Sequence, residues 1–104
     1  MEIKTVPVPA AGKTAQGLIV SWDGGQFVMI VAEKGVVSCG VVDKDVMERF
    51  DAAIAIARGT PEKPLRTVED LLAATIADVT KKASSSFGIE VGMKGEEALR
   101  KLCL

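Results

Sequence analysis

The sequence lacks histidine and tyrosine altogether. Without histidine, the Ser–His and Cys–His pairs of nucleophilic catalysis are excluded within this chain, and zinc sites lose their usual nitrogen ligand. The two cysteines, Cys39 and Cys103, form neither a metal-binding pair nor a disulfide framework. We therefore expect free thiols, no metal and no cofactor. Any general acid or base must be Asp, Glu, Lys or Cys.

A surplus of one charge is also missing, because 13 basic residues stand against 14 acidic ones and give a net charge of −1. Nucleic-acid binding needs a stripe of Lys and Arg that displaces counterions from the phosphates. Bases can also stack on aromatic side chains, but the chain has only one Trp and three Phe: Trp22, Phe27, Phe50 and Phe87. We expect no nucleic-acid partner.

Long hydrophobic runs are absent as well. None approaches the ~20 residues that a helix needs to span a bilayer. The first four residues, Met1 to Lys4, lack the basic start and apolar block of a signal peptide. We expect a cytoplasmic protein with no membrane partner.

Apolar residues are what the chain has in excess. Its 104 residues suit a single domain, 1–104, and a domain of this size buries roughly 60–68% of its unfolded surface. Yet 48% of the residues are hydrophobic and the mean hydropathy is +0.27. The surplus must lie on the surface or against another chain, which is a first indication of an oligomer.

Residues 1–42 are predicted to form a β-rich assembly region. We expect an antiparallel meander of three or four strands, at 3–8, 16–22, 26–32 and 36–42, with turns at 10–13 and 23–24. Pro7 and Pro9 place the first strand at a sheet edge, because proline cannot donate to a ladder.

The central strands are apolar on both faces. In residues 26–32, Phe27 and Met29 share one face, while Val28 and Ile30 share the other. An antiparallel sheet with one solvated face alternates apolar and polar residues instead. Helices of the same chain can cover one face, so we expect a second subunit to meet the other.

Residues 43–104 are predicted to be a mixed region of short helices and strands. The expected elements are a helix at 44–50 capped by Asp43, a buried strand at 52–57 with small residues on one face, a helix after the Thr67–Asp70 capping box, and helices at 81–87 and 96–102. Residues 75–80 fit a strand or a helix, and their β-branched residues favour a strand. The fold class is α+β: an N-terminal antiparallel β-meander followed by mixed strands and short helices packed on the sheet.

Several short motifs occur in a fixed order: GVVSCG at 35–40, DAA at 51–53, IARG at 56–59, TVEDLL at 67–72, and GIEVGMKG at 88–95 before Ala98 and Leu99. Together they resemble the YunC-like domain of unknown function of bacteria and archaea, over residues 15–102. The resemblance implies a small α+β domain whose N-terminal β region is associated with tetramerisation, and it implies no activity. The loop at 60–66 is longer than the family pattern, and Lys94 and Gly95 stand where a Thr or Ser cap is expected.

Four residues are the candidates for a site: Cys39, Asp43, Asp51 and Arg58. Cys39 reads as a buried small hydrophobe or as a nucleophile at a strand end near a helix N-terminus. Asp43 would oppose a thiolate there, and no histidine can activate the sulfur. Arg58 either holds a carboxylate or phosphate or forms a surface or interface ion pair with Asp51, Asp43 or Glu69. Asp51 and Arg58 lie near opposite ends of one short strand, so we expect that pair only across a symmetric interface.

The composition and pattern lead to a homo-oligomer, dimer or tetramer, that acts as a binding or assembly module of unknown biochemical role. Its expected partner is itself, with a small molecule as a further possibility. The alternative is a small enzyme or anionic-ligand-binding protein, whose site lies at a subunit interface and draws on Cys39, Asp43, Asp51 and Arg58. The sequence does not decide whether the chain catalyses a reaction.

Overall fold

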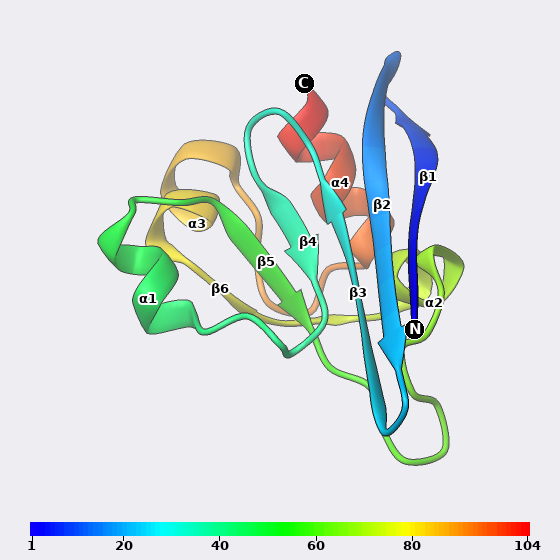
Figure 1. Cartoon of the computed structure of the whole chain (residues 1–104). Coiled ribbons are helices and arrows are strands. Elements are labelled where there is room, and N and C mark those ends of the chain that lie inside the picture. Colours follow the sequence, from blue (N-terminus) through cyan, green and yellow to red (C-terminus); the bar gives the residue numbers. More distant parts are fainter.

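The computed structural model describes residues 1–104 and contains one six-stranded sheet with the strand order β1-β2-β3-β4-β5-β6 (Figure 1). The strands are β1 (Glu2–Ala10), β2 (Lys13–Trp22), β3 (Gly25–Val31), β4 (Val36–Ser38), β5 (Ile54–Ala57) and β6 (Ile76–Val79). The first four form an antiparallel meander. β4 and β5 are parallel, and β5 and β6 antiparallel. The predicted α+β class is confirmed.

Four short helices complete the fold: α1 (Lys44–Arg49), α2 (Val68–Ala73), α3 (Lys81–Phe87) and α4 (Gly95–Cys103). Helices α2, α3 and α4 pack on one face of the sheet, where their buried residues join the hydrophobic core. Helix α1 lies beside the other face, next to β5 and β6 (Figure 1). No helix has the length and apolar character needed to cross a membrane.

The core lies between these three helices and the sheet. Val28 and Ile30 of β3 are fully buried there, as are the small residues Ala55 and Ala57 of β5. The helices approach closely because glycines provide room: a Cβ at Gly17 of β2 would lie 2.5 Å from the side chain of Val68 in α2. Small residues on one face of β5, as predicted, let the helices pack against the strand.

Local signals in the sequence account for most element ends. The β1–β2 turn has positive φ angles at Ala11 (51°) and Gly12 (78°), which is the type I′ pattern that matches strand twist. The capping box of Thr67 and Asp70 is present, and Gly88 ends α3 in the left-handed conformation. The turn at 10–13 and the capping box were predicted, and α3 ends at Phe87 as its predicted range does.

Residues 75–80 form a strand as predicted, since β6 spans Ile76–Val79. Thr80 follows it and caps α3. Its buried hydroxyl donates to the Ala52 carbonyl (2.6 Å) and accepts from the Ile54 amide (3.0 Å). This side chain therefore joins β5 to the start of α3 inside the core.

The predicted strand at 36–42 is wrong in its length, because β4 ends at Ser38. After Cys39 the chain turns at Gly40 and leaves the sheet for α1, whose N-cap is Asp43. Val41, which resembled a strand residue, is 54% exposed. The β-branched pattern was misleading because the helix cap, and not the apolar run, decides where the strand ends.

Candidate functional site

The sheet face opposite helices α2, α3 and α4 is called here the open face. Strand register shows which side chains share it, because directly paired residues point to the same side. One row joins Ile3, Val20 and Phe27, and the next joins Thr5, Leu18, Met29 and Ser38. A third row joins Pro7, Gln16, Val31 and Val36.

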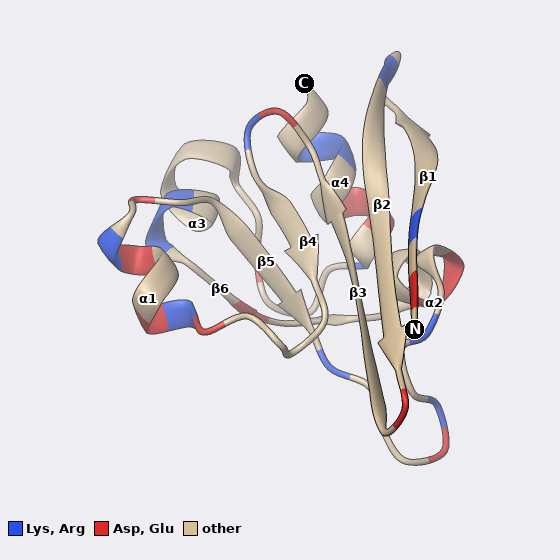
Figure 2. Cartoon of the chain, in the orientation of Figure 1, with Lys and Arg blue, Asp and Glu red and all other residues tan.

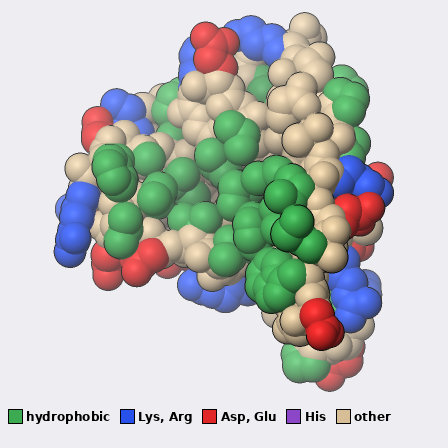
Figure 3. Space-filling view, viewed as in Figure 1, with side chains coloured by type: hydrophobic (Ala, Val, Ile, Leu, Met, Phe, Trp, Pro, Cys, Tyr) green, Lys and Arg blue, Asp and Glu red, His purple; other side chains and the backbone are tan.

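Large apolar side chains on the open face remain accessible. Ile3 is 65% exposed, Trp22 48% and Val31 42%, and four more residues are half-buried: Leu18, Val20, Phe27 and Met29. The Trp22 ring packs edge-on against Phe27, with ring centroids 6.1 Å apart. Figure 3 shows the resulting hydrophobic patch across this side of the molecule.

Charged side chains are absent from the open face of β1 to β4. The positions that point there are occupied by apolar residues and by Thr, Gln, Ser and Gly. Figure 2 shows that β3, β4 and β5 carry no Lys, Arg, Asp or Glu, whereas charged residues lie on the helices, the loops, β1 and β6. On β1 to β3 the open face is therefore a continuous, uncharged and largely apolar surface that this chain leaves accessible, whereas Ser38 of β4 is buried.

A second region lies where the parallel strands β4 and β5 end. Their carboxyl ends lie side by side, and such positions often bind ligands in open sheets. A Cβ at Gly40 would lie 3.7 Å from Cγ and 3.8 Å from Nε of Arg58, so the Arg58 side chain lies over this glycine. The structure thus brings the segment after β4 and the residue after β5 together.

Asp78 and Lys44 complete this carboxyl-end cluster, which consists of Gly40, Lys44, Arg58 and Asp78. Lys44 Nζ lies 3.1 Å from Asp78 Oδ1, and both side chains are partly exposed. Burial acts to raise the pKa of Asp78, but the Lys44 contact, the Val79 amide and the Arg58 charge outweigh it and hold that pKa below its usual range. Asp78 is therefore a carboxylate at neutral pH that is paired with Lys44 and only influenced from farther away by the charge of Arg58.

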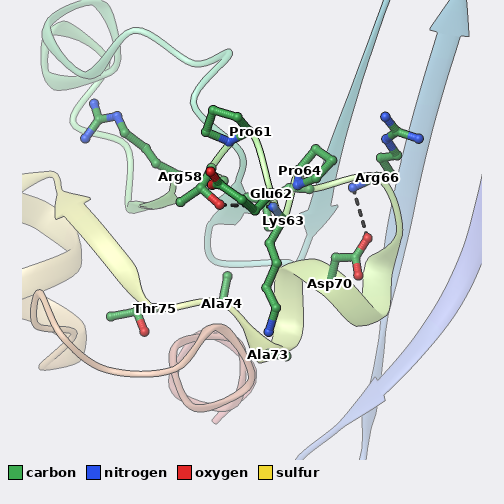
Figure 4. A pocket seen from close by; sticks show the side chains of 13 residues that line it. Arg58, Pro61, Glu62, Lys63, Pro64, Arg66, Asp70, Ala73, Ala74 and Thr75 are labelled. Atoms are coloured by element: carbon green, nitrogen blue, oxygen red, sulfur yellow. Dashed lines mark hydrogen bonds between the residues drawn. The ribbon is translucent and has the colours of Figure 1, made fainter.

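Arg58 forms no ion pair within the chain. The two ion pairs present join Lys44 to Asp78 and Lys82 to Asp51. Arg58 is exposed, and Figure 4 shows its guanidinium pointing away from the loop that follows it. Neither Asp43 nor Glu69 pairs with it, and Asp51 does not meet it within one subunit, as predicted.

Cys39 and Asp43 have structural roles. Cys39 is partly buried, packs against the core, and its amide donates to the Val28 carbonyl (3.1 Å). Asp43 caps α1 by accepting from the Asp45 amide (2.9 Å) and the Val46 amide (3.3 Å). No hydrogen bond or ion pair joins Cys39 or Asp43 to Arg58, so the three residues do not form a common site in the structure.

Asp51 lies apart from the other three candidates. It follows the C-cap of α1 and has a positive φ of 54°, a conformation that Asp and Asn tolerate better than most residues. Its carboxylate receives the Lys82 ammonium at 3.2 Å. We assign it to the end of the helix rather than to a site.

An open groove of about 830 Å³ lies between residues 58–66 and the C-terminal part of α2. Lys63 reaches across it toward Ala73, whereas Arg58 points away (Figure 4). Asp70 at its edge accepts from the Arg66 and Thr67 amides, which hold its pKa below the usual range. The polar side chains do not converge on one point, so the groove has no defined ligand geometry.

No group of three or more Cys, Asp or Glu side chains lies close enough together to hold a metal ion. The sequence did not indicate that Gly40 and Asp78 lie near Arg58, nor that Lys44 pairs with Asp78. Asp78 could have been recognised as a candidate site residue, because it is the only charged residue in the strand IADV. Its proximity to Arg58 required the β5–β6 register, which the sequence does not display.

Comparisons with known proteins agree with this fold. Residues 38–102 match the family model described as "Domain of unknown function (DUF1805)". The uncharacterized protein YunC of Bacillus subtilis is 28% identical over 100 residues, which are 96% of this chain and 97% of YunC. The crystal structure of TA1206, a protein of unknown function from Thermoplasma acidophilum, superposes with a TM-score of 0.85 at 19% identity, covering 97% of this chain and 93% of that one.

Proposed function

The chain belongs to the DUF1805 family, and from that premise we propose that it is a homo-oligomeric assembly module whose copies meet through the open face of the N-terminal strands. The supporting observation is the uncharged apolar surface formed by β1, β2 and β3. Burial of apolar surface favours association by roughly 25 cal/mol per Å². Contiguous exposed patches of this kind mark interaction sites in folded proteins.

Size-exclusion chromatography with light scattering tests the proposal. We expect a discrete oligomer at micromolar protein concentration, and a monodisperse monomer would overturn the proposal. Because the contact is apolar, sulfate should strengthen the association. Moderate sodium chloride should not weaken it, as it would weaken a contact between opposite charges.

Trp22 provides a second readout, since it is the only tryptophan and lies on the open face. Its fluorescence emission should shift to the blue as the protein is concentrated, because association removes water from the ring. The midpoint of this shift should coincide with the change in molar mass. An emission maximum that stays constant while the mass changes would place the contact elsewhere.

A second candidate function is the binding of a small anionic ligand at Arg58. It is favoured by the guanidinium that has no carboxylate partner and lies over Gly40 at the end of two parallel strands. Guanidinium groups bind phosphate and carboxylate through paired hydrogen bonds. If the site exists, phosphate should raise the Tm of the wild type, less that of Arg58→Lys, and not that of Arg58→Ala. A shift that survives Arg58→Ala would remove Arg58 from the site.

A further inference from the structure

We infer that residues 40–51, which contain α1, form a lid over the β4–β5 end of the open face, and that charged contacts hold this lid closed. The inference is independent of the proposed assembly, because it concerns a segment within one chain. Strand register places Ser38, Ile54 and Ile56 on the open face. All three are buried, whereas Met29 in the same row as Ser38 is only half-buried. A part of the chain must therefore cover this end of the face.

The cover is α1 with the chain on either side of it. Ile54 and Ile56 lie outside the core cluster that packs against α2, α3 and α4. Asp78 of β6 pairs in register with Ile56, so both side chains point to the open face. Lys44, the first residue of α1, forms its ion pair with this carboxylate. The helix therefore lies on the Ile56 side of the sheet, as Figure 1 shows.

Polar contacts with β6 and the start of α3 hold the lid in place. Besides the ion pair made by the first residue of α1, the Glu48 carboxylate accepts from the Lys81 amide at 3.1 and 3.2 Å. Lys82 lies 3.2 Å from the carboxylate of Asp51. No backbone group of residues 40–51 hydrogen-bonds to the sheet. Each contact that ties the lid to the rest of the chain thus involves a charged side chain.

Apolar packing contributes little to holding α1. None of its six residues is buried, and its half-buried side includes the charged residues Lys44 and Glu48 beside Met47. Val46 is exposed, and Phe50 at the C-cap is 72% exposed. Helices this short are unstable alone, and segments with few buried apolar contacts open at a lower free energy than the whole domain. The lid should open while the sheet stays intact, which would extend the apolar open face across β5.

Amide hydrogen exchange at fixed pH tests the inference on the wild type. The Met47 amide is hydrogen-bonded within the lid and is called the lid amide. The Val36 and Thr80 amides donate to the Ala53 and Ile54 carbonyls and are called the sheet amides. Relative to its intrinsic rate, the lid amide should exchange at least about tenfold faster than the sheet amides. Sodium chloride at about 0.5 M should widen this ratio roughly two- to threefold, because salt screens exposed charge pairs.

A double variant removes two of the three contacts without changing the net charge: Glu48→Ala with Lys82→Ala. It should speed the lid amide roughly three- to tenfold and leave the sheet amides within about twofold of the wild type. The matched control is Glu62→Ala with Lys63→Ala, which also removes one charge of each sign. Both control side chains are exposed and neither forms an ion pair. The control should exchange as the wild type does.

The outcomes decide between a separate lid and a rigid part of the domain. Equal protection of the lid and sheet amides in the wild type would overturn the inference, because the segment would then open only with the whole domain. This measurement decides the matter even if the double variant does not fold. A lid amide that ignores salt, or that responds equally to both double variants, would overturn the role of the charged contacts. A monomeric wild type would overturn the proposed assembly and leave the lid standing.

Discussion

The two faces of the sheet carry side chains of the same kind in very different surroundings. On β3, Val28 and Ile30 point to the helices and are fully buried. Their neighbours Phe27 and Met29 point to the open face and are only half-buried, and Val31 is 42% exposed. Alternate residues of β3 are therefore similarly hydrophobic, but only those that face the helices are removed from water.

This difference teaches how stability is divided between folding and association. Apolar area contributes to the folding of one chain only where helices α2, α3 and α4 remove it from water. The side chains on the open face can contribute most of their hydrophobic free energy only when a further surface removes them from water. Substitutions on the covered face should change the unfolding free energy of a single chain. Substitutions on the open face should change the part of the stability that depends on protein concentration, because it comes from association.

The largest effect is expected from a pair of substitutions on β3. Ile30→Ala should lower the free energy of unfolding by about 2–5 kcal/mol, because it leaves a cavity in a buried cluster. Met29→Ala should lower it less, and by an amount that depends on protein concentration, because it weakens association. Denaturant unfolding at two protein concentrations measures both. Equal losses, independent of concentration, would contradict the distinction between the faces.

The two buried hydroxyls give the next comparison. Thr80→Val leaves the Ile54 amide and the Ala52 carbonyl without their partner, and we expect a loss of about 2–3 kcal/mol. Thr80→Ser keeps the hydroxyl and should lose less. Ser38, on the open-face side of β4, donates only to the adjacent Cys39 carbonyl (2.8 Å). Ser38→Ala should therefore change the unfolding free energy least, and a ranking in any other order would refute the role given to Thr80.

Two glycines sharpen the comparison further. A Cβ at Gly17 on the covered side would meet the buried Val68 side chain at 2.5 Å, so Gly17→Ala should destabilise by about 1–2 kcal/mol. Adding Val68→Ala should offset part of the steric conflict, so the two losses are not additive. A Cβ at Gly25 would meet the Trp22 ring at 2.7 Å, but this ring lies on the open face and can swing outward.

Gly25→Ala should consequently shift the Trp22 emission while lowering the midpoint of thermal unfolding less than Gly17→Ala does. Thermal scans of the three single variants and of the double variant measure this. Additive losses for Gly17→Ala and Val68→Ala would show that the two side chains do not conflict.

The smallest effect concerns pH. The pKa of Asp78 is lowered in the folded state, so its contribution is fully present above the ordinary value of about 3.9 and is lost as the pH falls through the folded pKa. Asp78→Asn should therefore flatten the decline of Tm below about pH 4, with little change near neutral pH. A decline as steep as that of the wild type would exclude Asp78 as a source of the acid sensitivity.

Local chemistry made much of the fold predictable. The capping box at Thr67, the Asp43 cap and the left-handed Gly88 depend only on residues within a few positions of each other. Strand alternation likewise predicted two apolar faces. It could not say which face the helices would cover, because that depends on how the chain after β4 returns to the sheet.

The carboxyl-end cluster shows the same limit. Arg58 was a candidate from its position after a strand, but its neighbours Gly40 and Asp78 lie 18 and 20 positions away in the sequence. They come together only through the parallel pairing of β4 with β5 and the antiparallel pairing of β5 with β6. Strand register over such separations is set by tertiary packing. The sequence therefore could not show that these residues lie close together.

The helix layer has a consequence for stoichiometry. Because α2, α3 and α4 occupy one side of the sheet, each chain presents a single open face, and a contact that uses it is saturated by one partner. Growth by this contact stops at a pair. A tetramer would then be a pair of pairs, joined through other apolar residues. The exposed candidates lie before, on and directly after α1: Val41, Val46 and Phe50.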